Sequence, residues 1–205
     1  SRHPQSVKAS RGYAEWLLDR GRSEDATPHL DNCAKLDPNS TETGAVLGLA
    51  ARYRKDFAAA EKIFESLHRE SPGNAFFGWN LAISLAESGD AKKRERAVQL
   101  ADALSRQFPR EGEGFAVLGW CLFKAGRIEE AAQAFQTRAN LGSFGSDTAY
   151  FIARLLETRG NLGDAKRLLK DALAQTDPFV YRKDAEMLLA ELEKRQPSSP
   201  EEPKK

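Results

Sequence analysis

Histidine and cysteine side chains are the groups in this 205-residue sequence whose types could support nucleophilic, acid–base or metal chemistry. Their spacing does not fit such chemistry. Cys33 and Cys121 form no CxxC pair, and His3, His29 and His68 fall in three separate parts of the chain, so zinc-ligand spacing is absent. The sequence also lacks Walker, Rossmann and HExxH patterns. We therefore predict a protein that is not an enzyme and that uses no metal and no cofactor.

The charge balance and the apolar runs argue against two other classes of protein. The chain has 31 Lys and Arg against 30 Asp and Glu, whereas a domain dedicated to nucleic acid is usually clearly basic. No apolar run approaches the roughly 20 residues that a membrane-spanning helix needs. We therefore expect no nucleic acid as a partner and no direct membrane insertion. Two isolated cysteines of buried type favour the cytoplasm, with the periplasm as an alternative.

A repeat organises the elements that must position any binding site. Proline recurs at Pro4, Pro38 and Pro72, 34 residues apart each time. An alanine recurs at Ala26, Ala60, Ala97, Ala131 and Ala165, and a glycine at Gly21, Gly89, Gly126 and Gly160, with Lys55 in the second glycine slot. A fixed period of this length indicates a solenoid, in which each unit buries its apolar face against its neighbours.

Each repeat has the apolar spacing of two helices. In the fourth repeat, Phe115, Leu118, Gly119 and Leu122 fall at i, i+3, i+4 and i+7, and Gly126 is placed to end that helix. The same pattern predicts the helix pairs 5–19 with 23–36, 41–53 with 57–70, 74–87 with 92–108, 111–124 with 128–140, and 146–158 with 162–175. The fold class predicted is all-α: a right-handed α-solenoid of helix-turn-helix repeats.

These units divide the chain into five repeats at about 5–38, 39–72, 73–109, 110–143 and 144–177. Asp177 and Pro178 resemble a helix start, so we expect a capping helix over 178–195. Residues 197–205 are Pro, Ser and charged residues, and we expect them to be disordered. Pro4 fills the slot that would close a preceding repeat, so we expect a fragment of a longer repeat protein.

The repeat resembles the tetratricopeptide repeat, whose pattern is a large apolar residue, Leu-Gly, Tyr, Ala, Phe and finally Pro. The residues that carry this resemblance are Phe115, Leu118, Gly119, Leu122, Ala131 and Phe135 in the fourth repeat, and Leu47, Gly48, Ala60, Phe64 and Pro72 in the second. Smaller residues replace the first aromatic in the other repeats: Ser10, Gly44, Gly78 and Ala149. The resemblance covers about residues 5–195 and implies the fold more strongly than any one function.

In tetratricopeptide proteins the first helix of each pair lines a concave groove that holds a peptide or a partner helix. Placing this sequence on that pattern implies the following groove residues: Arg52, Tyr53, Phe76, Trp79, Ile83, Trp120, Phe123, Lys124, Tyr150 and Arg154. Glu87 falls on the same face. Aromatic residues and arginines dominate binding hot spots, which favours a groove for a segment with apolar anchors. The alternative is that several of these rings fill gaps between neighbouring first helices, as the small residues Gly44, Gly78 and Ala149 would allow.

The resemblance implies a non-catalytic scaffold or adaptor that binds a protein or peptide partner. A second reading is a regulatory or substrate-recruiting domain of a larger enzyme or of a membrane-associated assembly. Self-association is a further expectation, because the first repeat would present apolar residues, Tyr13 and Trp16, on its outer end.

Overall fold

The structure is a computed structural model that describes residues 6–195, and over that range it contains eleven helices and no strand. The expected tail at 197–205 lies outside the described residues. The helices are α1 (Val7–Asp19), α2 (Ser23–Leu36), α3 (Thr41–Tyr53), α4 (Phe57–Glu70), α5 (Ala75–Ala86), α6 (Ala91–Gln107), α7 (Gly112–Lys124), α8 (Ile128–Asn140), α9 (Ser146–Thr158), α10 (Leu162–Ala174) and α11 (Arg182–Lys194). The all-α solenoid prediction is confirmed.

In four of the five helix pairs, the turn between the two helices depends on a residue in the left-handed region of backbone conformation. Gly21, Gly126 and Gly160 have φ angles of 70°, 79° and 77°, so they end α1, α7 and α9 without a steric penalty. Lys55 occupies the same place after α3 with a φ of 61°. A side chain in this conformation costs on the order of 1 kcal/mol. The second repeat therefore carries backbone strain that the glycines avoid.

Small residues let the two helices of a pair approach closely. A Cβ atom on Gly48 would lie 2.6 Å from the ring of Phe64, and one on Gly119 would lie 2.6 Å from the ring of Phe135. Both phenylalanines are buried in the second helix of their own pair. The recurring Gly or Ala in the first helix is thus a packing requirement of the repeat.

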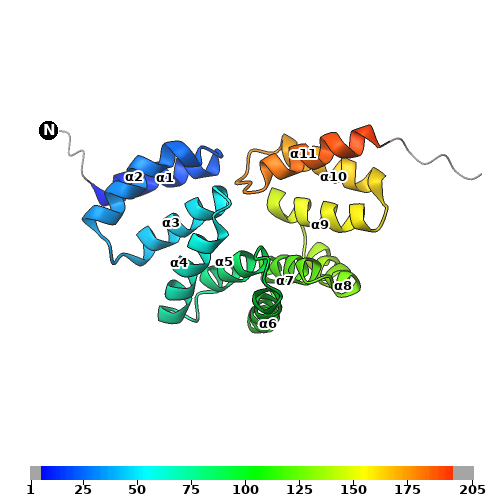
Figure 1. The fold of residues 1–205 in the computed structure, drawn as a ribbon, viewed down its shortest axis with the longest axis horizontal. Coiled ribbons are helices and arrows are strands. Elements are labelled where there is room, and N and C mark those ends of the chain that lie inside the picture. The colour runs from blue at the N-terminus through cyan, green and yellow to red at the C-terminus, as the bar shows by residue number, and fades with distance from the viewer. Residues whose placement is uncertain (1–5, 196–205) are drawn as a thin grey trace, which may run out of the picture.

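The helix pairs stack into an arc that nearly closes on itself (Figure 1). Figure 1 shows α4, α6 and α8 along the outside of the arc and the loop before α11 opposite the end of α1. A cavity of about 390 Å³ separates these two ends and is lined from one side by Asp19–Gly21 and from the other by residues of 173–182. The inner side of the arc, called the concave face below, is therefore bounded by both ends of the described chain.

The C-terminal helix begins later than we expected, at Arg182 instead of Pro178. The Asp177 carboxylate does not cap its own helix, because it accepts hydrogen bonds from the backbone N–H and the hydroxyl of Ser146 at the start of α9. Phe179, Val180 and Tyr181 then run through a buried loop. Residues 178–181 are thus drawn into contact with the concave face and cannot form the first turn of a helix.

Two further features bear on partners. Within residues 6–195, no helix combines the length and apolar character required to cross a membrane. Tyr13 and Trp16 are both exposed on α1, where their rings stack with centroids 5.6 Å apart and the Arg20 guanidinium covers Trp16. Self-association through this end stays a prediction.

Candidate functional site

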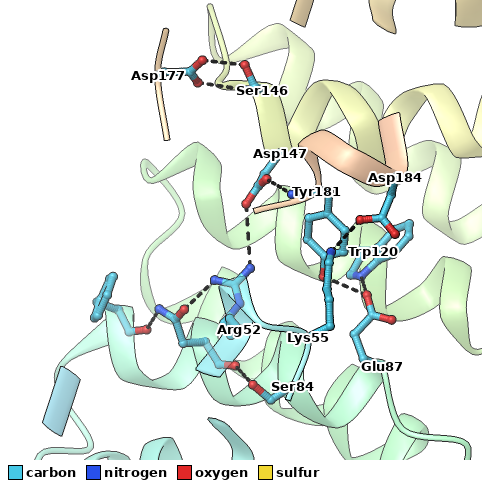
Figure 2. Close-up of polar contacts among 12 residues, drawn as sticks. Arg52, Lys55, Ser84, Glu87, Trp120, Ser146, Asp147, Asp177, Tyr181 and Asp184 are labelled. Carbon is cyan, nitrogen blue, oxygen red and sulfur yellow. Dashed lines mark hydrogen bonds and ion pairs between the residues drawn. The ribbon is translucent and has the colours of Figure 1, made fainter. Parts of the chain in front are cut away.

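Polar side chains from five parts of the chain converge on the concave face: from α3, α5, α7, α9 and the segment around the start of α11 (Figure 2). Glu87 follows the last residue of α5 and accepts hydrogen bonds from Trp120 Nε1 at 2.9 Å, from Lys124 Nζ at 2.8 Å and from the Tyr181 hydroxyl at 2.8 Å. Such donors replace the hydrogen bonds with water that a largely buried carboxylate loses. Glu87 therefore ties α5, α7 and the loop before α11 together.

Aromatic rings pack around these hydrogen bonds. The ring of Tyr181 stacks on Tyr150 with centroids 5.2 Å apart, and Trp120 stacks on Phe151 at 4.3 Å and on Phe123 at 5.4 Å. Burial raises the pKa of Tyr181 well above its ordinary value, and the nearby Glu87 charge adds to the effect. The Tyr181 hydroxyl thus stays protonated and can donate to Glu87 throughout the physiological pH range.

Lys55 reaches the C-terminal helix from the strained turn after α3. Its ammonium lies 2.7 Å from the Asp184 carboxylate and 3.6 Å from the centre of the Tyr181 ring. Burial lowers the pKa of Lys55, and the hydrogen bond and charge of Asp184 oppose that shift. The ammonium thus combines an ion pair with a cation–π contact: Tyr181 lies just before α11, and Asp184 lies in its first turn.

Arg52 joins the second repeat to the start of α9. Its guanidinium donates to Asn80 Oδ1 at 2.6 Å and lies 3.8 Å from the Asp147 carboxylate, which also accepts the Tyr181 backbone N–H at 3.2 Å. Burial raises the pKa of Asp147 to about 6, although Arg52 and the Tyr181 N–H both favour the charged form. The protonation state of Asp147 is therefore sensitive to pH near neutrality.

The groove residues implied by the resemblance have different neighbours in the structure. Trp120, Phe123 and Tyr150 meet around Tyr181, and Lys124 joins them through Glu87. Arg154 donates a hydrogen bond to the Tyr150 hydroxyl. The others lie along α3 and α5: Arg52, Tyr53, Phe76, Trp79 and Ile83. Phe76 contacts Phe64 and Phe77 instead, and Trp79 packs close to Gly114.

The ten implied groove residues also differ in how far their side chains are exposed to solvent. Four side chains are buried against the rest of the chain: Arg52, Ile83, Trp120 and Tyr150. Phe76 is exposed, and the remainder are partly exposed: Tyr53, Trp79, Phe123, Lys124 and Arg154. The buried rings therefore fit the alternative in which aromatic residues fill gaps, while the partly exposed residues are available to a partner. Their role in binding stays a prediction.

Five residues of this polar network were not among the predicted site residues: Lys55, Asn80, Asp147, Tyr181 and Asp184. Lys55 carried a signal in the sequence, because it stands in a glycine slot of the repeat. Asp147, Tyr181 and Asp184 carried none, since their partners come from repeats far away in the chain. A cavity of about 230 Å³ adjoins the network and is lined by residues that include Tyr150, Arg154 and Asp184.

Within residues 6–195, no group of three or more His, Cys, Asp or Glu side chains is arranged to hold a metal ion. The charged groups of the network instead neutralise one another as ion pairs and hydrogen bonds. The arrangement can hold a polypeptide segment by aromatic stacking, charge and hydrogen bonds.

Comparison with known proteins agrees with this architecture. The family model for the tetratricopeptide repeat matches residues 90–140. No curated protein matches the sequence. Among solved structures, a thermophilic tetratricopeptide repeat protein from Thermus thermophilus superposes with a TM-score of 0.73 at 16% identity, over 91% of this chain and 98% of that one.

Two other solved structures are similar. A tetratricopeptide repeat protein from Parabacteroides merdae gives a TM-score of 0.74 at 14% identity, over 93% of this chain and 72% of its own. MamA from Desulfovibrio magneticus RS-1 gives 0.56 at 18% identity, over 94% of this chain and 97% of its own. At these identities the likeness shows the fold alone.

Proposed function

We propose that this chain of tetratricopeptide repeats is a non-catalytic scaffold that binds an extended or helical segment of a partner protein on its concave face. One observation carries the proposal: the concave face already receives a polypeptide segment, residues 177–184 of the same chain. A surface that holds one segment by its backbone, an aromatic ring and a carboxylate has the chemistry to hold another.

The partly exposed residues next to the network are the proposed contacts for the partner. Phe123 supplies an apolar ring beside Trp120, while Lys124 and Arg154 supply positive charge at the edge of the network. Both cations are also paired with carboxylates of the chain, Glu87 and Glu157. A partner would therefore gain from aromatic contact at Phe123 and from acidic groups that share these two cations.

Affinity capture with a matched pair of variants tests the proposal. The bait is the full chain, compared with Lys124→Ser/Arg154→Ser on the concave face and with Arg167→Ser/Lys170→Ser on α10. The control pair is well exposed, with side-chain exposures of 75% and 59%, and it removes the same total charge. Circular dichroism establishes that each bait is folded.

We expect the partner to be retained by wild type and by the α10 variant and to be lost with the concave-face variant. Equal retention by all three folded baits would reject the concave face as the binding surface. Because Trp120 is buried, its replacement by alanine would test folding more than binding, so it is not used as a probe.

A further inference from the structure

We propose that the 177–184 segment occupies the binding site for the partner on the concave face of its own chain. The partner displaces this segment and binds through a tyrosine and, three residues later, an acidic residue of its own. This inference rests on the proposed function and adds to it the chemistry of the partner and the step that binding requires. The argument follows from the contacts that Tyr181 and Asp184 make with repeats far from their own.

The first step is that the contacts of the 177–184 segment reach farther than a capping role requires. A capping helix needs to cover only the last helix pair, because a repeat in a solenoid contacts its immediate neighbours. Here Tyr181 donates to Glu87, 94 residues earlier, and Asp184 pairs with Lys55 of the second repeat. These contacts cross the concave face from one side of the arc to the other and exceed what capping requires (Figures 1 and 2).

The second step is that the receiving residues are suited to a tyrosine and a carboxylate. Glu87 accepts the phenol hydroxyl, Tyr150 and Trp120 contact the ring, and Lys55 lies over the ring while pairing with the acid. A hydrophobic ring alone would leave Glu87 short of one donor, and a basic residue in place of Asp184 would repel Lys55. The site therefore selects both side chains at once.

The third step is that the second repeat departs at this place from the first, fourth and fifth repeats. Where Gly21, Gly126 and Gly160 end the first helix of other pairs, Lys55 holds the same left-handed conformation with a side chain. The lysine reaches the 177–184 segment, where it contacts Asp184 and the Tyr181 ring. A glycine would relieve the backbone and remove the contact with Tyr181 and Asp184.

The fourth step concerns exchange. The Lys55 and Asp184 side chains are 34% and 40% exposed, so this end of the segment lies at the surface, although the two atoms of the ion pair, Nζ and Oδ2, are themselves buried. A segment tethered to the same chain has an effective concentration of about millimolar. Because it occupies most copies of the site, the apparent affinity of a competing partner falls with the fraction of sites that are free. Substitutions that release the segment from the site should therefore increase the affinity of the chain for a peptide with the same side chains.

A synthetic peptide is the direct probe. A fluorescein-labelled peptide with the sequence of residues 175–190 is titrated with the full chain, and binding is followed by fluorescence anisotropy. The proteins are wild type and Tyr181→Ser/Asp184→Ser, in which the segment loses both groups. A second peptide carries Ser at the positions of Tyr181 and Asp184. A third protein adds Lys55→Gln to the double variant.

We expect the double variant to bind the first peptide at least tenfold more tightly than wild type does. We also expect no measurable binding of the Ser-containing peptide and at least a fivefold loss on adding Lys55→Gln. Equal binding by wild type and double variant, binding of both peptides alike, or indifference to Lys55→Gln would each overturn the inference.

A milder variant keeps the test decisive if the double Ser variant does not fold. Tyr181→Phe/Asp184→Asn retains the buried ring and removes only the hydroxyl and the charge, and at least threefold tighter binding than wild type is expected. Failure of the peptide experiment alongside a selective partner loss with Lys124→Ser/Arg154→Ser would reject this inference and keep the proposed function. Failure of both experiments would reject both.

Discussion

The ammonium of Lys55 lies 2.7 Å from the carboxylate of Asp184, although the third, fourth and fifth helix pairs separate the two residues in the chain. The arc brings them together, and the lysine adopts a left-handed backbone conformation to make the contact. This relationship links backbone strain in the second repeat to the position of the C-terminal helix, and the substitutions below examine its parts.

Two substitutions of Lys55 distinguish the energetic cost of its backbone strain from the stabilisation that its side chain provides. Lys55→Ala loses the ion pair and keeps a Cβ atom in the left-handed region, whereas Lys55→Gly loses the ion pair and relieves the strain. We expect the glycine variant to be more stable than the alanine variant by about 1 kcal/mol in urea unfolding. Equal unfolding free energies would mean that the turn carries no strain.

Replacing Gly119 tests the close approach of α7 and α8. Gly119→Ala would place a methyl group 2.6 Å from the ring of Phe135, and we expect a loss of about 1–3 kcal/mol in unfolding free energy. The control is Gly163→Ala on α10, where nothing lies within 4 Å of the added Cβ, and it should be neutral or stabilising by up to about 1 kcal/mol. A neutral Gly119→Ala would contradict the packing described above.

Asp147 should make stability depend on pH. Its pKa is about 6 in the folded chain against an ordinary value of 3.8, so the folded state takes up a proton between pH 7 and pH 4 that the unfolded state takes up only at lower pH. The contribution of Asp147 to stability is therefore fully present below about pH 4 and is lost as the pH rises through 6. Relative to Asp147→Asn, wild type should gain on the order of 1–3 kcal/mol between pH 7 and pH 4.

The measurement is urea unfolding of wild type and Asp147→Asn at several pH values. The difference between the two proteins removes the pH dependence of all other groups that they share. Parallel curves would show that Asp147 has the same pKa in both states of the chain.

Removing the Tyr181 hydroxyl should cost less than removing the ring. Tyr181→Phe leaves Glu87 with the donors of Trp120 and Lys124, so we expect a loss of about 1–2 kcal/mol in unfolding free energy. Tyr13→Phe is the matched control, because Tyr13 is 46% exposed, and it should change stability by less than about 0.5 kcal/mol. A loss from Tyr181→Phe no larger than that of the control would mean that the Glu87 contact adds nothing.

The helices could be predicted from the sequence because their signals are local. Glycine at the turns, small residues facing Phe64 and Phe135, and the helical spacing of apolar residues all act within one repeat. The position of α11 could not be predicted in the same way. The residues next to Asp177 in the sequence make it resemble an N-cap. Only the fold brings Ser146 close enough to donate hydrogen bonds to the Asp177 carboxylate.

The site was predictable only in part for the same reason. A pattern of first helices identifies which residues lie toward the inside of an arc, and it placed Trp120, Lys124 and Tyr150 there. It does not tell how tightly the arc curves. That curvature decides that Trp120 and Tyr150 are covered by Tyr181 while Phe123 and Lys124 remain partly accessible.

The near closure of the arc also bears on how the chain unfolds. An open array of repeats loses structure from its ends one unit at a time, because each unit is held only by the next. Here the last helix is bonded through Asp184 to Lys55, and the loop before it is bonded through Tyr181 to Glu87. Unless a partner supplies these contacts in its place, the C-terminal end therefore cannot fray without breaking contacts in the first half of the chain, and the repeats of the free protein should melt together in a single cooperative transition.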